Sequence, residues 1–164
     1  ELARLGADLG SDVPFFVSEV PRAQGWGRGD RIVPLDPLPP RPVLLVVPHE
    51  PIATAWAYGV LVAHRAGKDD LPEGSRPRPA IEASWPAIEA SVWNDFEAAL
   101  SPHRPELAEI KASLEEAGAR PALLSGSGCA VFGVFDSEER VATAEASLGG
   151  LTMEARVLRT RTRG

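Results

Sequence analysis

Hydrophobic residues in this chain form short runs separated by turn residues, a pattern that predicts a mixture of strands and helices. Residues 43–47 are an unbroken apolar run ended by Pro48, which is typical of a strand buried on both faces. Shorter extended segments are predicted at residues 13–17, 22–26, 31–35, 122–125, 130–135 and 151–158. A glycine-rich turn is predicted at residues 27–30 and a charged loop at residues 68–79.

Helical spacing predicts three further segments. A helix over residues 54–63 would have Thr54 as its N-cap, and a last helix up to residue 148 would have Ser137 as its N-cap. Residues 81–118 also show helical spacing, which is broken at Pro86, Pro102 and Pro105 and ends at Gly118. The apolar residues that mark one buried face there are Leu107, Ile110 and Leu114.

The order of elements predicts an α+β fold. The second half of the chain reads helix–strand–strand–helix–strand, with an earlier strand and helix at residues 43–63. That order suits a ferredoxin-like domain, in which an antiparallel sheet carries helices on one face. A proline cluster between residues 34 and 42 excludes helix and is expected to act as a stiff connector.

Composition adds limits on the function. The chain has 164 residues, of which 44% are hydrophobic, and a formal net charge of -6. We expect no nucleic-acid or membrane partner, because phosphate backbones and anionic lipids select basic faces and no apolar run reaches the roughly 20 residues of a membrane helix. Cys129 is the single cysteine, which excludes an intrachain disulfide and fits a cytoplasmic protein.

The two ends of the chain carry expectations of their own. The first residues read as the last turns of a helix, without an initiator Met, which suggests a fragment of a longer protein. The arginine-rich tail at residues 156–163 is expected to be frayed and solvated.

Asp12 is the first candidate for chemistry. It stands between Gly10 and an apolar run, so its carboxylate would be held on rigid backbone and partly desolvated, as a general base requires. The simpler interpretation is that Asp12 only caps a turn, since aspartate is common there.

A glycine motif between two predicted strands is the second candidate. Gly126 and Gly128 would let backbone N–H groups converge on a phosphate, with Ser125 and Ser127 beside them. No Gly-Lys-Ser/Thr follows, so the motif is not a Walker loop, and a strand follows where a dinucleotide fingerprint needs a helix. A plain hairpin connection is the alternative.

Thr54 and Tyr58 are the third candidate. They are four residues apart, so on a helix their hydroxyl and aromatic ring would share one side and could hold a base or polar ligand. The alternative is an N-cap and a core aromatic. Asn94 and Asp95 are expected to make hydrogen bonds at a helix start, and the three histidines have no metal-ligand spacing, so no metal site is predicted.

The order of these motifs resembles the galactokinase, homoserine, mevalonate and phosphomevalonate (GHMP) kinase superfamily, and within it the 4-diphosphocytidyl-2-C-methyl-D-erythritol kinases. The resemblance runs over nearly the whole chain. It is most specific at residues 9–16 (Leu-Gly-Ser-Asp-Val-Pro-Phe-Phe) and residues 124–132 (Leu-Ser-Gly-Ser-Gly-Cys-Ala-Val-Phe). It is also carried by the turn at residues 27–30, by Thr54 with Tyr58, and by the Asn-Asp-Phe-Glu segment at residues 94–97.

The resemblance implies a fold, a reaction and a set of residue roles. Residues 1–36 would be a remnant of the N-terminal kinase domain and residues 41–164 the C-terminal domain. The enzyme would be a phosphotransferase that uses ATP with Mg²⁺ on an alcohol in isoprene biosynthesis. Asp12 would take the proton from the hydroxyl, and Thr54 and Tyr58 would line the pocket for a cytidine diphosphate-linked methylerythritol. Ser125, Gly126, Ser127 and Gly128 would support the phosphate site.

Two departures from the family lead to a further expectation. The family's glycine- and serine-rich ATP loop and its lysine lie upstream of the segment that Asp12 matches, and neither stands in these 164 residues. We therefore expect the chain alone to be inactive, with the missing half or another chain covering an exposed edge. The alternatives are another small-alcohol kinase of the superfamily and a non-catalytic ferredoxin-like binding module.

Overall fold

The computed structural model describes residues 2–26, 31–66, 84–149 and 154–163. Backbone contacts divide the chain into two units. The first takes its described residues from 2–26, 31–40, 84–88 and 163, and the second from 41–66, 89–149 and 154–162. The turn predicted at residues 27–30 and the loop predicted at residues 68–79 lie outside the described residues. Among the described helices, none has the length and apolar character of a membrane span.

The first unit begins with two short helices, α1 (Leu2–Leu9) and α2 (Val13–Val17), which pack closely. A Cβ added at Gly6 would lie 2.8 Å from a methyl carbon of Val13, so the glycine permits this approach. The strand predicted at residues 13–17 is wrong. Pro14 occupies the first turn of α2, where its fixed φ favours a helix, and a five-residue apolar run fits either structure.

A two-stranded antiparallel ribbon completes the first unit. Its strands are β1 (Ala23–Trp26) and β2 (Arg31–Pro34), so the extended segments predicted at residues 22–26 and 31–35 are confirmed.

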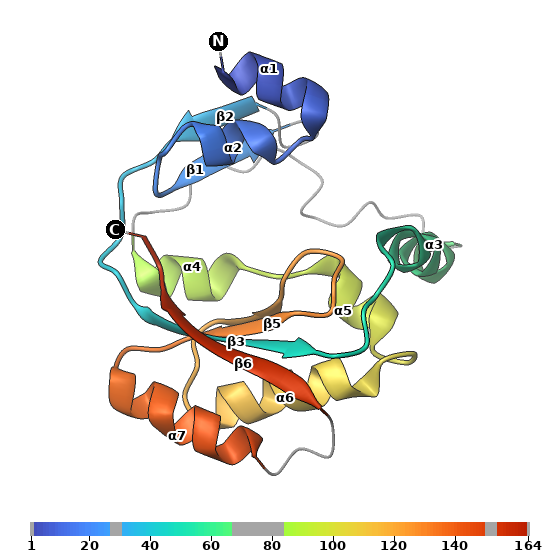
Figure 1. Cartoon of the computed structure of the whole chain (residues 1–164), viewed down its shortest axis with the longest axis vertical. Coiled ribbons are helices and arrows are strands. Elements are labelled where there is room, and N and C mark those ends of the chain that lie inside the picture. Colours follow the sequence, from blue (N-terminus) through green and yellow to red (C-terminus); the bar gives the residue numbers. More distant parts are fainter. Residues whose placement is uncertain (1, 27–30, 67–83, 150–153, 164) are drawn as a thin grey trace. The chain divides into compact units, whose positions relative to one another are not determined.

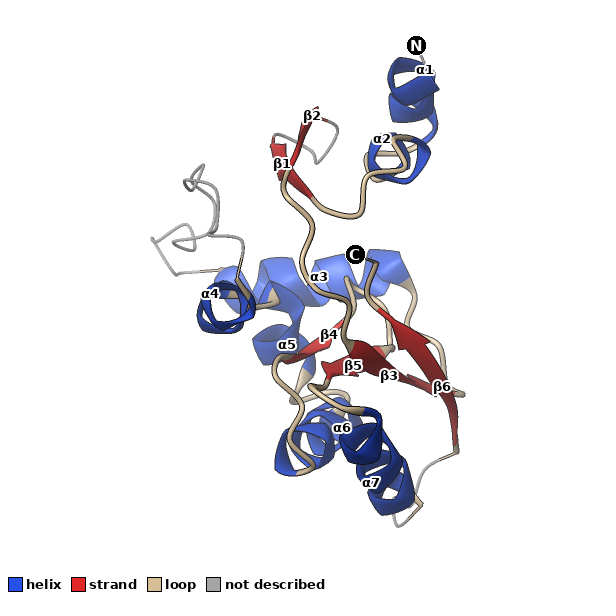
Figure 2. Cartoon of the chain, turned by 90° about the vertical axis from the view of Figure 1, so that its left-hand side faces the viewer, coloured by secondary structure: helices blue, strands red, loops and turns tan. Residues whose placement is uncertain are grey.

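The second unit is built on a four-stranded antiparallel sheet, which confirms the predicted α+β class (Figure 1). The strands are β3 (Pro42–Pro48), β4 (Ala122–Leu124), β5 (Val131–Val134) and β6 (Ala155–Arg161), in the spatial order β4-β5-β3-β6. The apolar run predicted as a buried strand is therefore the central β3. Helices α6 (Pro105–Glu116) and α7 (Glu138–Leu148) cover one face of the sheet (Figure 2).

The core lies between that face and the two helices. Leu44 and Val46 of β3 are fully buried, as are Ile110 and Leu114 of α6. Leu107 is also buried, so the predicted apolar face of this helix is confirmed. A close approach of α6 to the sheet is possible because β5 has Gly133 at the contact.

Three more helices lie in the chain order before α6: α3 (Thr54–Arg65), α4 (Trp85–Ser91) and α5 (Asp95–Leu100). The N-cap predicted at Thr54 is wrong, since Ala53 holds that position and Thr54 is the first helical residue. Pro86 is the second residue of α4 rather than a break in a helix, because a proline in the first turn removes no helical hydrogen bond. Gly118 follows α6 with a φ of 97°, as a helix-ending glycine does.

The predicted cap of α7 is confirmed. The Ser137 hydroxyl accepts a hydrogen bond from the Arg140 backbone N–H at 3.4 Å. Glu139 lies in the first turn, where hydrogen bonds from its own backbone N–H and from the Ser137 side chain lower its pKa below the ordinary 4.5. The folded state therefore favours the Glu139 carboxylate. The stability that this charged form contributes is lost as the pH falls from the ordinary value of 4.5 through the lowered pKa.

The expectation of a frayed arginine tail is wrong. Residues 155–161 form β6 and pair with β3 along its whole length, with Val157 packed against the core. Arg159 and Arg161 reach Glu145 and Glu138 of α7, although these exposed ion pairs each contribute little. Charge therefore did not prevent pairing, because main-chain hydrogen bonds and the packing of Ala155 and Val157 against the core hold the strand.

Two glycine substitutions should have opposite effects on stability. A Cβ at Gly133 would lie 2.8 Å from the Ala119 Cβ and 3.2 Å from the Phe135 ring, so Gly133→Ala is expected to destabilise by about 1–3 kcal/mol. Gly59 is inside α3 with nothing within 4 Å of an added Cβ, so Gly59→Ala is expected to stabilise by about 0.5–1 kcal/mol. Urea denaturation of both variants measures this, and equal effects would contradict the packing described here.

Candidate functional site

The predicted glycine motif is the turn that joins β4 to β5. The Ser125 N–H donates to the Ala130 carbonyl at 2.7 Å and closes the turn. Gly126 has a φ of 61°, a conformation that side-chain-bearing residues rarely adopt, and an added Cβ there would meet nothing within 4 Å. The turn, defined here as residues 125–130, is therefore a surface hairpin connection with open space at Gly126.

Asn94 connects this turn to the start of α5. Its Oδ1 accepts from the Phe96 N–H at 2.9 Å and so caps the helix. Its Nδ2 donates to the carbonyl oxygens of Leu124 and Gly126, both at 2.8 Å. The helix-start hydrogen bond predicted for Asn94 is confirmed, but the same side chain also holds the turn.

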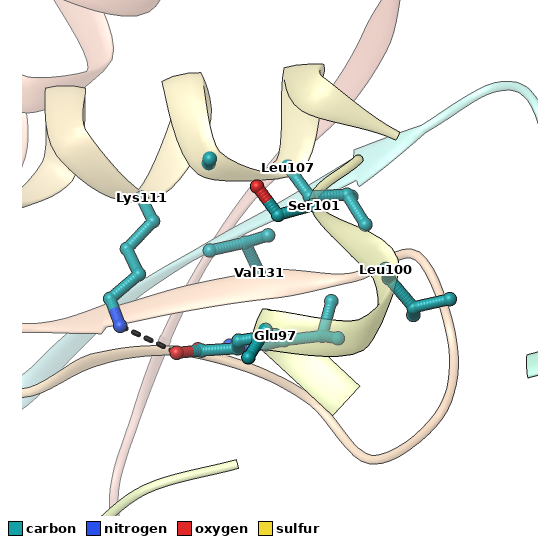
Figure 3. Close-up of a pocket in the computed structure, with 9 residues that line it drawn as sticks. Glu97, Leu100, Ser101, Leu107, Lys111 and Val131 are labelled. Atoms are coloured by element: carbon teal, nitrogen blue, oxygen red, sulfur yellow. Dashed lines mark hydrogen bonds and ion pairs between the residues drawn. The ribbon is translucent and has the colours of Figure 1, made fainter. Parts of the chain in front are cut away.

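Glu97, one turn further along α5, holds the neighbouring strand. Its Oε1 accepts from the Leu124 N–H at 2.7 Å, and its Oε2 accepts from the Lys111 Nζ of α6 at 2.6 Å (Figure 3). Both main-chain groups of Leu124 are thus satisfied by side chains of α5. Because β4 is an edge strand, these bonds replace those that a further strand would have made.

A mainly apolar pocket of about 260 Å³ lies where α5, α6 and the sheet meet. Figure 3 shows the side chain of Lys111 extended toward Glu97, with which it forms an ion pair. Its lining includes Glu97, Leu100, Ser101, Leu107, Lys111 and Val131. None of the residues predicted to carry chemistry lines it, so we do not assign it to the candidate site.

Tyr58 is an exposed side chain of α3, with 54% of its surface accessible, which rules out a core aromatic. Its ring meets the Phe96 ring edge to face, with centroids 5.1 Å apart. Thr54 is exposed one turn earlier on the same helix. The first turn of α5 therefore touches two predicted segments: the glycine turn through Asn94, and α3 through Phe96.

Asp12 belongs to the first unit, in the tight connection between α1 and α2. Its carbonyl accepts from the N–H groups of Phe15 and Phe16, at 3.1 and 3.4 Å. Its side chain is exposed, so the partial desolvation predicted for this carboxylate is wrong. It makes no capping hydrogen bond, although it stands at the N-cap position of α2, so the simpler interpretation as a side-chain cap is also wrong. The carboxylate oxygens are thus not used by this helix.

The described residues hold no group of three or more His, Cys, Asp or Glu that could bind a metal ion. Sequence reasoning did not find the roles of Phe96 and Glu97. The signal was present, since Asn94 and Glu97 are three residues apart at a helix start, a spacing related to the capping box. In this structure the glutamate bonds to a neighbouring strand rather than back to the cap.

Comparisons with known proteins bear on this arrangement. Residues 78–151 match the family described as GHMP kinases C terminal. The 4-diphosphocytidyl-2-C-methyl-D-erythritol kinase of Solidesulfovibrio magneticus is 39% identical over 154 residues, covering 92% of this chain and 51% of that protein. The kinase of the same name from Geobacter sp. strain M21 is 38% identical, covering 90% and 50%. The chain thus spans about half the length of the curated relatives it matches.

Two solved structures share the fold. A crystal structure of 4-(cytidine 5'-diphospho)-2C-methyl-D-erythritol kinase matches with a TM-score of 0.72 and 30% identity, over 100% of this chain and 58% of that one. Homoserine kinase from Cytophaga hutchinsonii matches with a TM-score of 0.55, covering 82% and 46%; at 18% identity it supports the fold alone.

The chain therefore contains a GHMP kinase C-terminal domain. Its relatives at 38–39% identity are 4-diphosphocytidyl-2-C-methyl-D-erythritol kinases.

Removing the Glu97 carboxylate should weaken the sheet edge. Glu97→Ala leaves the Leu124 N–H and Lys111 without their partner, so we expect a loss of about 1–3 kcal/mol in the free energy of unfolding. Glu97→Gln keeps an oxygen for Leu124 and should lose less. Glu109→Ala, at an exposed position of α6, is the control and should change stability by less than about 0.5 kcal/mol. Chemical denaturation measures the free energy of unfolding of each variant. A Glu97→Ala variant as stable as Glu109→Ala would refute the role of Glu97 in stabilising the edge strand β4.

Proposed function

We propose that this chain is the C-terminal part of an ATP-dependent kinase that phosphorylates the 2-hydroxyl of 4-diphosphocytidyl-2-C-methyl-D-erythritol in non-mevalonate isoprenoid biosynthesis. The main support is the 39% identity with a kinase of that name over 92% of the chain. We further propose that residues 1–36 are a remnant of the N-terminal kinase domain and residues 41–164 the C-terminal domain.

Asp12 is proposed as the general base. The substrate hydroxyl gives its proton to the Asp12 carboxylate as its oxygen attacks the γ-phosphorus of ATP. A new oxygen–phosphorus bond forms while the bond from phosphorus to the ADP oxygen breaks. The proposal is supported by the match of residues 9–16 to the family's motif and by the Asp12 carboxylate oxygens, which no capping bond occupies.

The residues Ser125 to Gly128 are proposed to lie against the phosphates of ATP. The open space at Gly126 and the N–H groups of a surface turn suit an anion. Mg²⁺ bound with ATP would offset the phosphate charge.

Thr54 and Tyr58 are proposed to line the pocket for the cytidine diphosphate-linked substrate. The Tyr58 ring meets the Phe96 ring edge to face and still has 54% of its surface accessible, which suits contact with a planar base.

The reaction is tested on the product of the complete reading frame that contains this sequence. With ATP and Mg²⁺ it should convert 4-diphosphocytidyl-2-C-methyl-D-erythritol to the 2-phosphate and ADP, followed by chromatography and phosphorus NMR. Homoserine and mevalonate serve as comparison alcohols, and faster turnover of either would move the assignment to another kinase of the superfamily. The 164-residue chain alone should give no turnover, since the ATP loop and lysine that the resemblance implies are not within it.

Replacing the proposed base tests the mechanism. Asp12→Asn keeps the size of the side chain but cannot accept the proton at neutral pH, so kcat is expected to fall by about 10²–10⁴-fold. Asp8→Asn, an exposed aspartate of α1, is the matched control and should leave kcat within about twofold of the parent. Near-normal turnover by Asp12→Asn would remove this residue from the mechanism.

A further inference from the structure

We infer that Asn94 is a positioning residue for the nucleotide phosphates: by holding the Gly126 carbonyl, its side chain aims the Ser127 N–H away from α5 and toward the ligand. The inference rests on the proposed function, because it assigns the glycine turn to the phosphates of ATP. Asn94 itself would touch neither substrate nor nucleotide.

The Asn94 side chain makes three hydrogen bonds. Its oxygen caps α5, and its nitrogen donates to the carbonyls of Leu124 and Gly126 at 2.8 Å each. Asparagine alone among the usual helix-capping residues combines an acceptor with two such donors on a side chain of this length. Aspartate has no donor, and serine has a single short hydroxyl.

The peptide unit that joins Gly126 to Ser127 fixes the direction of the Ser127 N–H. Within the described residues the cis peptide bond is Arg120–Pro121, so the unit joining Gly126 to Ser127 is trans. In a trans unit the N–H points opposite to the C=O. Because the Gly126 carbonyl points to Asn94, the Ser127 N–H points away from it.

The Ser127 N–H is a donor available to a ligand. Within the described part of the chain, the Ser127 N–H makes no hydrogen bond, whereas the Ser125 N–H is paired with Ala130 at 2.7 Å. Ser127 is half-buried, and a Cβ added at the neighbouring Gly126 would meet nothing within 4 Å. An unused donor whose direction is set by the Asn94 hydrogen bond suits a phosphate oxygen, because less conformational freedom is lost on binding.

Two substitutions separate the capping of α5 by the Asn94 oxygen from the hydrogen bonds that the Asn94 nitrogen donates to Leu124 and Gly126. Asn94→Ser and Asn94→Asp both keep a good N-cap for α5, but neither can donate to the two carbonyls. In the complete protein, ATP binding measured by calorimetry should weaken by about tenfold, the value of one well-placed hydrogen bond. The KM for ATP should rise in step, while the KM for the alcohol substrate stays within about twofold of the parent.

A matched control removes a different cap. Ser137→Ala removes the cap of α7, which makes no contact with the glycine turn among the described hydrogen bonds, so it should lower the melting temperature and leave ATP affinity unchanged. If Asn94→Ser weakens ATP binding only as much as Ser137→Ala does, the role of Asn94 is structural and the inference fails.

The remaining outcomes distinguish this inference from the proposed reaction. A parent protein that binds ATP but phosphorylates none of the tested alcohols refutes the reaction, and weaker ATP binding by Asn94→Ser would still uphold the inference. A parent that binds no ATP overturns the inference, because the turn then receives no phosphate. Equal ATP affinity of the parent and Asn94→Ser overturns the inference and leaves the proposed reaction standing.

Discussion

The attachment of α5 to the outer edge of β4 is the interaction on which the candidate site depends. Leu124 has its N–H bound by Glu97 and its carbonyl bound by Asn94, so a strand of three residues is held by side chains where another strand would be expected. The same short helix turns Phe96 toward Tyr58. Loss of this attachment would release the edge strand, the glycine turn and the support of α3 together.

This arrangement explains how a surface turn can be rigid without being buried. Glycine at position 126 supplies the backbone conformation, but it also gives the chain more freedom than any other residue would. The turn is instead restrained by the side-chain amide of Asn94, the N-cap of α5. That helix is anchored in turn by Ala99 and Leu100, which are buried. The Asn94 side chain thus connects the glycine turn, which is proposed to bind the ligand, to a helix anchored in the core.

Much of the fold could be predicted from the sequence because local signals and tertiary structure agree. The apolar run at residues 43–47 became the central strand, and Ser137 caps its helix as its position indicated. The strand predicted at residues 13–17 was wrong because a run of five apolar residues shows neither helical nor strand periodicity. The segment is a helix, and Pro14 in its first turn favours that structure. The arginines of β6 are exposed as predicted, but the segment was mistaken for a frayed tail, since charge predicts exposure and not main-chain pairing.

The candidate site was harder to predict than the fold. Thr54, Tyr58 and the glycine turn were predicted as site residues from residue type and order, and this stays a prediction. Nothing in their spacing indicates that Asn94 contacts the turn and Phe96 contacts Tyr58. Such a connection depends on contacts between residues about thirty positions apart, which periodicity cannot reveal. The relation of Asp12 to the glycine turn stays a prediction, because the two lie in different units.

The central position of β3 has a consequence for how this domain is made. On the ribosome β3 emerges before every other strand of its sheet, but its two neighbours are β5 and β6, and β6 ends at residue 161. One side of β3 must therefore stay without its partner until residues 155–161 have been synthesised. Nascent chains that stall before these residues would expose an apolar strand with free main-chain groups, which makes them natural clients for ribosome-associated chaperones.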